Sequence, residues 1–137
     1  MNITLKLRNS LERAIKGYDS SSVINFSDWF LTTIPKMLEE MADKNKYSYP
    51  PEFKDLDEWN KQIRKISALL KESDETNCSM KNEYWEDYWY RAFTLNQKAT
   101  LDKEKWILRE NEIDEYRKKC FHKAMELLEK YFYYLWM

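Results

Sequence analysis

Between Glu52 and Met137 the chain contains no glycine and no proline. Its single glycine is Gly17, and its three prolines all lie before Glu52. Tight turns, hairpins and phosphate-binding loops depend on glycine, because glycine reaches positive φ at little cost. The sequence therefore predicts an all-α protein and disfavours active sites that are built on glycine-rich loops.

The length and composition predict one globular domain over residues 1–137. The chain is 43% hydrophobic and 34% charged, and its formal net charge is −1. A nearly neutral chain has no overall field to attract long nucleic acid, so such a partner is not expected. The two cysteines lie far apart, at Cys78 and Cys120, and no apolar run reaches the length of a membrane span. These features predict a cytoplasmic protein with no disulfide and no membrane partner.

Apolar residues recur at helical spacing in several stretches, which predicts a bundle of four or five helices. The first stretch ends at Gly17, where a glycine can terminate a helix, and the second covers residues 22–43. A third helix starts at Asp55, where Asp55 and Glu58 form a capping box, with Glu58 returning to the Asp55 amide. A fourth is expected to start near Asn82, and a last long helix covers residues from about 100 to the end. Loops are expected near 44–54 and 72–81.

Pro35 interrupts the second predicted helix. A proline inside a helix removes one backbone hydrogen bond and clashes with the preceding turn. The apolar stripe nevertheless continues in phase across Pro35, from Phe30 to Met37. This continuity favours one Pro-kinked helix over two separate helices.

The densest aromatic cluster in the chain lies between Tyr84 and Phe93, and Arg91 lies inside it. Aromatic faces stack on bases and also form protein-binding hot spots, and arginine adds a phosphate ligand. A helix buried on several sides, or an oligomer contact, would explain the same composition. The predicted binding residues here are Tyr84, Trp85, Tyr88, Trp89 and Arg91.

A basic run on the last predicted helix supplies the other candidate binding residues, Arg117, Lys119 and Lys123. These side chains could meet a phosphate. Asp114, Glu115 and Glu126 lie within one or two helical turns of them, so pairing on a solvated face is the alternative.

No motif for catalysis or metal binding stands out. The only histidine, His122, has Glu126 at i+4, and one such pair is better explained as a surface ion pair than as a metal site. Cys120 lies on the apolar stripe, which indicates a small core residue rather than a nucleophile. We therefore expect a protein that is not an enzyme and that has no metal and no cofactor.

The C-terminus is unusually aromatic, with Tyr131, Phe132, Tyr133, Tyr134 and Trp136 close together. So much apolar surface is unfavourable at an exposed end. The tail is therefore expected to dock into its own bundle or into a neighbouring subunit.

Several short elements occur together in a fixed order. They are Gly17-Tyr18-Asp19, Phe26-x-x-Trp29-Phe30-x-x-x-Ile34-Pro35, Asp57-Glu58-Trp59 and Lys130-Tyr131-Phe132-x-x-Leu135-Trp136. In these elements the chain resembles a group of small phage-encoded helical proteins. The resemblance covers about two-thirds of the chain, and it departs from the group between Glu83 and Glu112. It implies a phage origin and a setting in the host cytoplasm, and it implies no catalytic activity.

These observations together predict a binding protein that forms homo-oligomers. With the phage resemblance, the leading hypothesis is an anti-defence factor that binds a host immune protein or sequesters a small nucleotide signal. The alternative is a virion structural or assembly accessory protein that acts through oligomer contacts.

Overall fold

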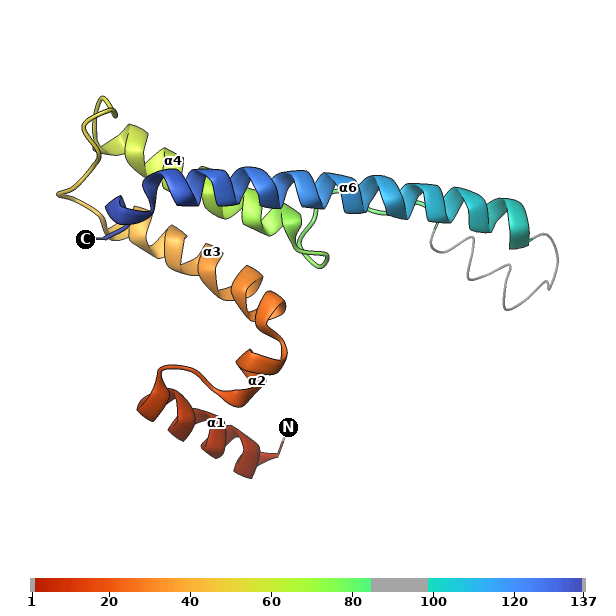
Figure 1. The fold of residues 1–137 in the computed structure, drawn as a ribbon, viewed down its shortest axis with the longest axis horizontal. Coiled ribbons are helices and arrows are strands. Elements are labelled where there is room, and N and C mark those ends of the chain that lie inside the picture. Colours follow the sequence, from red (N-terminus) through yellow and green to blue (C-terminus); the bar gives the residue numbers. More distant parts are fainter. Residues whose placement is uncertain (1, 85–98, 137) are drawn as a thin grey trace.

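In the computed structural model, which describes residues 2–84 and 99–136, every regular element of those two ranges is a helix (Figure 1). The all-α prediction is confirmed. The elements are α1 (Ile3–Lys16), α2 (Ser20–Ile24), α3 (Phe26–Lys44), α4 (Leu56–Ser73), α6 (Ala99–Tyr131) and the 3₁₀ turn η1 (Phe132–Tyr134). The intervening loops agree with those expected near 44–54 and 72–81.

Helix α4 is the centre of the core. Its predicted apolar face is fully buried at Trp59, Ile63, Ile66 and Leu70, and this single face packs against both α3 and α6. The rings of Phe53, Trp59 and Tyr131 pack together at one end, with centroids 5.1 to 5.4 Å apart. Because the apolar side of α4 carries both contacts, residues on the opposite side of this helix, such as Glu58, Lys65 and Ala68, are exposed.

The second predicted helix is interrupted earlier than expected. It was predicted over residues 22–43 as one helix, but the structure has the short α2, a non-helical Asn25 with φ −111° and ψ 51°, and then α3. Asp19 caps α2 by accepting a hydrogen bond from the Ser22 amide at 2.8 Å. Helix α3 continues through Pro35, so the choice of one helix across the proline was right and its start was wrong.

The end of α1 and the start of α4 lie where the sequence predicts them, with one change in the cap of α4. Gly17 ends α1 with φ +83°, as predicted for a glycine in this place. Asp55 accepts from the Glu58 amide at 2.8 Å, but the Glu58 carboxylate accepts from the Lys54 amide at 3.1 Å rather than from that of Asp55. The reciprocal half of the capping box is therefore shifted by one residue.

The buried Ser67 hydroxyl of α4 donates to the Pro35 carbonyl at 3.0 Å. This bond ties α4 to α3 beside the proline, where the helix loses one of its own backbone hydrogen bonds.

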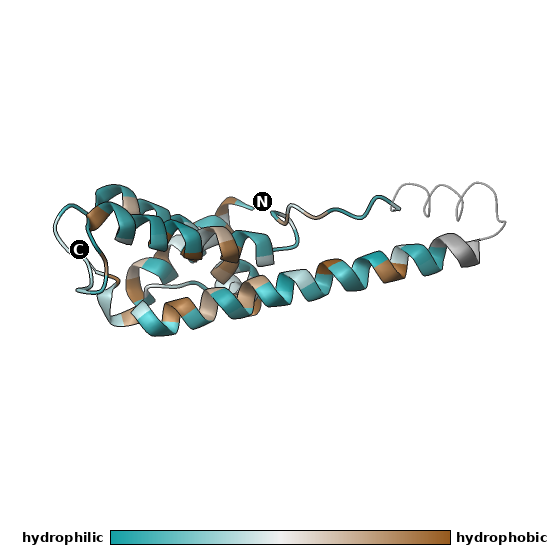
Figure 2. Cartoon of the chain, turned by 90° about the horizontal axis from the view of Figure 1, so that it is seen from above, coloured by the Kyte–Doolittle hydropathy of each residue, from teal (hydrophilic) through white to brown (hydrophobic). Residues whose placement is uncertain are grey.

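Helix α6 has 33 residues and extends well beyond the packed helices (Figures 1 and 2). Its projecting part is accompanied by residues 80–84. Asn82 donates to the Trp106 carbonyl at 3.1 Å, and Arg109 pairs with Glu83 at 2.9 Å. The C-terminal half of α6 supplies the core residues Ala124, Leu128 and Tyr131.

The dependence of the core on α4 can be tested at Ile63, which is completely buried. We expect Ile63→Ala to lower the free energy of unfolding by about 2–5 kcal/mol, because it removes core contacts and leaves a cavity. Lys65→Ala, on the exposed side of the same helix, should change it by less than about 0.5 kcal/mol. Urea unfolding followed by circular dichroism measures both values, and equal effects would contradict this description of the core.

Candidate functional site

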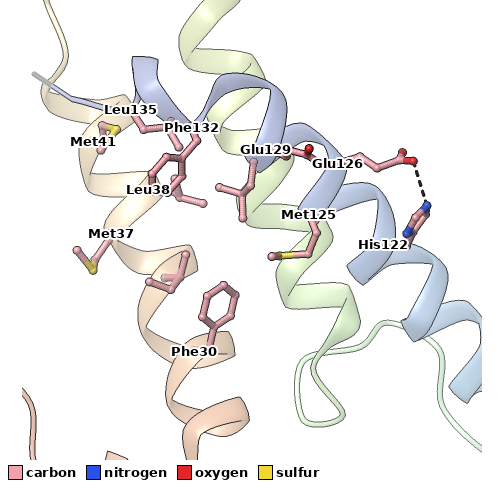
Figure 3. Close-up of a pocket in the computed structure, with 12 residues that line it drawn as sticks. Phe30, Met37, Leu38, Met41, His122, Met125, Glu126, Glu129, Phe132 and Leu135 are labelled. Atoms are coloured by element: carbon pink, nitrogen blue, oxygen red, sulfur yellow. Dashed lines mark ion pairs between the residues drawn. The ribbon is translucent and has the colours of Figure 1, made fainter.

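The main candidate site is an apolar groove between α3 and the C-terminal half of α6 (Figure 3). Both helices pack on α4, but no Cα atom described in α3 lies within 8 Å of one described in α6. The space between them is open to solvent and has a volume of about 520 Å³. The lining residues are Phe30, Ile34, Met37, Leu38, Met41, His122, Met125, Glu126, Leu128, Glu129, Phe132 and Leu135.

The groove is suited to an apolar side-chain surface. Its floor is formed by Leu38 and Leu128, which belong to the core. Its sides carry three methionines, Met37, Met41 and Met125, whose flexible thioethers adapt to differently shaped partners. Aromatic and methionine-lined grooves of this kind receive amphipathic helices in many complexes.

The polar groups of the groove lie on its α6 edge. His122 Nε2 and Glu126 Oε1 are 3.0 Å apart, and Glu129 lies one turn from Glu126. The predicted surface ion pair of His122 and Glu126 is confirmed. No cluster of three or more His, Cys, Asp or Glu side chains with metal-ligand geometry occurs in residues 2–84 and 99–136. The α6 edge of the groove thus carries two carboxylates and one imidazole, whereas the floor is apolar.

The groove continues toward α2 as a longer apolar trough. A second hollow of about 200 Å³ shares Phe30 and Met125 with the groove and adds Phe26 and Phe121. A third, of about 230 Å³, shares Phe26 and adds side chains of α2 and its flanks, Tyr18, Ser22, Val23 and Trp29. Contiguous exposed apolar surface of this kind marks interaction sites in folded proteins.

Helix α1 contacts its own chain through its polar side. Asn9 donates to the Ser21 hydroxyl at 3.0 Å, the Glu12 carboxylate accepts from the Ser20 amide at 2.6 Å, and Arg13 pairs with Asp19. The hydrogen bond from the Ser20 amide lowers the pKa of Glu12, and that from the Ser22 amide lowers the pKa of Asp19. These contacts form a polar elbow between α1 and α2.

The apolar stripe of α1 is exposed to solvent in the part of the chain that the structure describes. Among the described elements α1 contacts only α2, and the stripe residues lie away from that contact. The exposed fractions are 75% for Ile3, 66% for Leu7, 61% for Leu11 and 74% for Ile15. An amphipathic helix normally turns this stripe toward a core. Here the polar side of α1 contacts the rest of the chain and the apolar side faces solvent. This exposed apolar side is suited to binding a partner surface.

The aromatic candidate site is described only at its first residue. Tyr84 is half-buried beside Lys105 and Arg109, and its amide donates to Asn82 Oδ1 at 3.0 Å. The other predicted residues of this cluster, Trp85, Tyr88, Trp89 and Arg91, lie outside the described residues. Their assignment to a ligand, a core or an interface stays a prediction.

The residues of the basic run differ in their surroundings. Arg117 donates to the Ser73 carbonyl at 3.0 Å and so satisfies the end of α4, and Lys118 pairs with Asp114 at 2.8 Å. Lys119 and Lys123 are exposed. Lys119 is ten residues from Arg109, about 15 Å along α6, so the structure does not bring it together with Tyr84. The solvated-face alternative agrees better with these positions.

A polar cluster joins the end of α4 to α6. Glu72 Oε2 accepts from Tyr116 Oη at 2.8 Å and from Ser79 Oγ at 2.7 Å. The Ser79 hydrogen bonds lower the pKa of Glu72, and the contact with Glu72 raises the pKa of Tyr116 to about 12. Cys120 is buried next to Tyr116, which agrees with the predicted core position.

The aromatic tail docks only in part. Tyr131 is buried in the core and Leu135 is half-buried at the groove, whereas Phe132, Tyr133 and Trp136 are exposed. Of the two predicted alternatives, docking into the chain's own bundle holds for Tyr131 and not for the whole tail. A neighbouring subunit is the alternative that the sequence left for these side chains.

The sequence did not identify the groove, although the apolar stripe from Phe30 to Met37 forms part of its α3 wall. Helical spacing alone cannot say whether a stripe is covered by another element. The available signal was a surplus of apolar residues on α3, α1 and the tail over what one α4-centred core can bury.

None of the helices in the described ranges is both long enough and apolar enough to be a membrane span.

The Glu72 cluster gives a test of the electrostatics. We expect Tyr116→Phe to lower the free energy of unfolding by about 1–2 kcal/mol at neutral pH, because it removes a hydrogen bond to an ionised carboxylate. Since the pKa of Glu72 is lowered by folding, its contribution is complete above its usual pKa and is lost as the pH falls through the lowered value. The difference between the variant and the wild type should therefore shrink in acid. Tyr133→Phe, on the exposed tail, is the control, and a difference that stays constant down to low pH would contradict the role of Glu72.

Comparisons of the chain with protein-family models, curated proteins and solved structures gave no match. No function therefore comes from a relative, and the surfaces described above are the basis for assigning one.

Proposed function

We propose that this protein is a non-enzymatic binding protein that recognises another protein through the apolar groove between α3 and α6. The observation that carries this proposal is the open groove of about 520 Å³ with an apolar floor and one acidic edge. A groove lined by Leu, Met and Phe side chains of two helices fits an amphipathic helix of a partner. Its methionines allow such a helix to bind without close steric complementarity.

The same chemistry favours a protein over a nucleotide as the ligand of this groove. Phosphate groups need cationic or amide donors, whereas the polar edge here carries Glu126 and Glu129, and its one imidazole, that of His122, is paired with Glu126. Two carboxylates at the edge oppose an anion and favour a partner with basic residues beside its apolar stripe. Sequestration of a nucleotide rests on the cluster from Trp85 to Arg91, outside the described residues.

The phage resemblance supplies the setting of the proposal. In the host cytoplasm, the protein would act as an anti-defence factor that occupies a host immune protein and needs no cofactor. The second candidate is a virion structural or assembly accessory protein. The exposed side chains of Phe132, Tyr133 and Trp136 favour that candidate, because they provide further apolar surface for contacts in an assembly.

The proposal predicts that a charge in the groove abolishes function without unfolding the protein. The variant is Met125→Glu, at an exposed position of the groove, and the matched control is Ala68→Glu, on the exposed side of α4. Both substitutions add one negative charge. Each chain is produced in bacteria that carry one of a panel of defence systems, and the plaquing efficiency of a sensitive phage is measured.

We expect the wild type and Ala68→Glu to restore plaque formation against at least one system, and Met125→Glu to fail. Circular dichroism must show that both variants remain folded. Equal rescue by Met125→Glu would exclude the groove as the working surface. No rescue by any chain, with the protein recovered in purified virions, would favour the assembly candidate instead.

A further inference from the structure

The packed part of the molecule consists of the three helices α3, α4 and α6. Helices α3 and α6 lie on one face of α4 and stay apart from each other, so the position opposite α4 is open. In four-helix bundles this position is filled by a helix whose apolar stripe faces the other three. The groove residues Leu38 and Leu128 are where such a helix would complete the core.

The chain also contains a helix whose apolar side is exposed. Helix α1 has an apolar stripe of Ile3, Leu7, Leu11 and Ile15 that no described residue covers. Its 14 residues correspond to a length of about 21 Å, and the α3 wall of the groove from Phe30 to Met41 has a length of about 17 Å. A helix of this size can fill the groove along its whole length.

The charges at the two surfaces are complementary. By helical spacing Lys6 and Arg8 lie on opposite sides of the α1 stripe, and both are exposed. The α6 edge of the groove has two carboxylates, that of Glu126, which pairs with His122, and that of Glu129. An α1 helix in the groove would therefore bring basic residues toward an acidic edge.

The α1 helix of the same chain is held away from the groove. The polar elbow joins it to α2 through Asn9, Glu12 and Arg13, and Figure 1 shows α1 beyond α2 and apart from α6. Moving α1 into its own groove would break these contacts, whereas a second copy can receive α1 with the elbow intact.

We propose that two copies of this chain form a dimer in which the α1 stripe of each copy occupies the α3–α6 groove of the other. Each groove gains a fourth helix, and each stripe gains a cover. The interface is isologous: α1 of each copy contacts the groove of the other, as in the exchange of an identical element between protomers. This inference goes beyond the proposed function and stands independently of it, since it concerns what covers the groove in the free protein.

The test is the oligomeric state of three chains, measured by native mass spectrometry and sedimentation across a dilution series. The wild type should have twice the chain mass of 16.9 kDa. The stripe variant Leu7→Glu/Leu11→Glu and the groove variant Met125→Glu should each be monomeric over the range where the wild type is dimeric. We expect the dimer Kd to rise by roughly 100-fold or more, since burial of one leucine changes an equilibrium by about ten- to a hundred-fold. Ala68→Glu is the control and should remain dimeric.

A mixture of the two monomeric variants gives the decisive observation. The stripe variant keeps an intact groove, and the groove variant keeps an intact α1. One of the two reciprocal contacts can therefore form between them, and a heterodimer should appear in the mixture but in neither variant alone. Because the substituted positions are exposed in the single chain, both variants should keep the wild-type helical content.

Four results would overturn the proposal. A dimeric groove variant beside a monomeric stripe variant would show that α1 pairs with α1. A monomeric wild type that binds vesicles containing anionic lipid through α1 would assign the stripe to a membrane surface. A monomeric wild type without such binding would leave the groove open in solution. Folded, monomeric variants that give no heterodimer when mixed would exclude α1 as the occupant. In each case a groove-dependent rescue of plaque formation would still support the proposed function, so the two proposals fail separately.

Discussion

The structure depends on the narrow apolar face of α4. Trp59, Ile63, Ile66 and Leu70 lie on one side of this helix, and that side carries the apolar contacts with α3 and α6. Two helices that share one face of a third diverge on the opposite side, and the groove is the space that this divergence leaves. The core and the candidate site therefore share residues. Leu38 and Leu128 pack in the core and also line the floor of the groove.

Polar contacts decide the orientation of the N-terminal arm. An amphipathic α1 would be expected to turn its stripe toward the nearest apolar surface. Instead, the Glu12 carboxylate caps the start of α2 and Arg13 pairs with Asp19, which is itself the cap of α2. These bonds satisfy groups at a helix start that would otherwise be unpaired, and they need the polar side of α1 for this purpose. The exposed stripe is therefore a consequence of how α2 begins.

The sequence predicted what depends on local spacing. The helix end at Gly17, the Asp55 cap and the buried face of α4 follow from residues within a few positions of one another, and all are present. The sequence did not predict the interruption at Asn25, because the apolar stripe runs through it in phase.

The sequence also did not predict which apolar stripes would be buried by another helix. Phe30 on α3 and Ile15 on α1 belong to equally regular stripes, and only the arrangement of whole helices shows that one lines a groove and the other faces solvent. The aromatic site from Trp85 to Arg91 stays a prediction from composition.

The exposed stripe and the open groove place conditions on any partner. Apolar surface of this extent is unfavourable in water, so a free protein that leaves both surfaces open is less stable than one that pairs them. If α1 of a second copy is the resting occupant, a host protein can enter the groove only by displacing it. Such a partner must then present what α1 presents and bind more tightly: an apolar stripe of about four turns, basic residues on its sides to face Glu126 and Glu129, and side chains that Met37, Met41 and Met125 can accommodate. Selectivity would come from this competition, because a helix with acidic sides would be repelled by the edge and a shorter stripe would leave part of the groove uncovered.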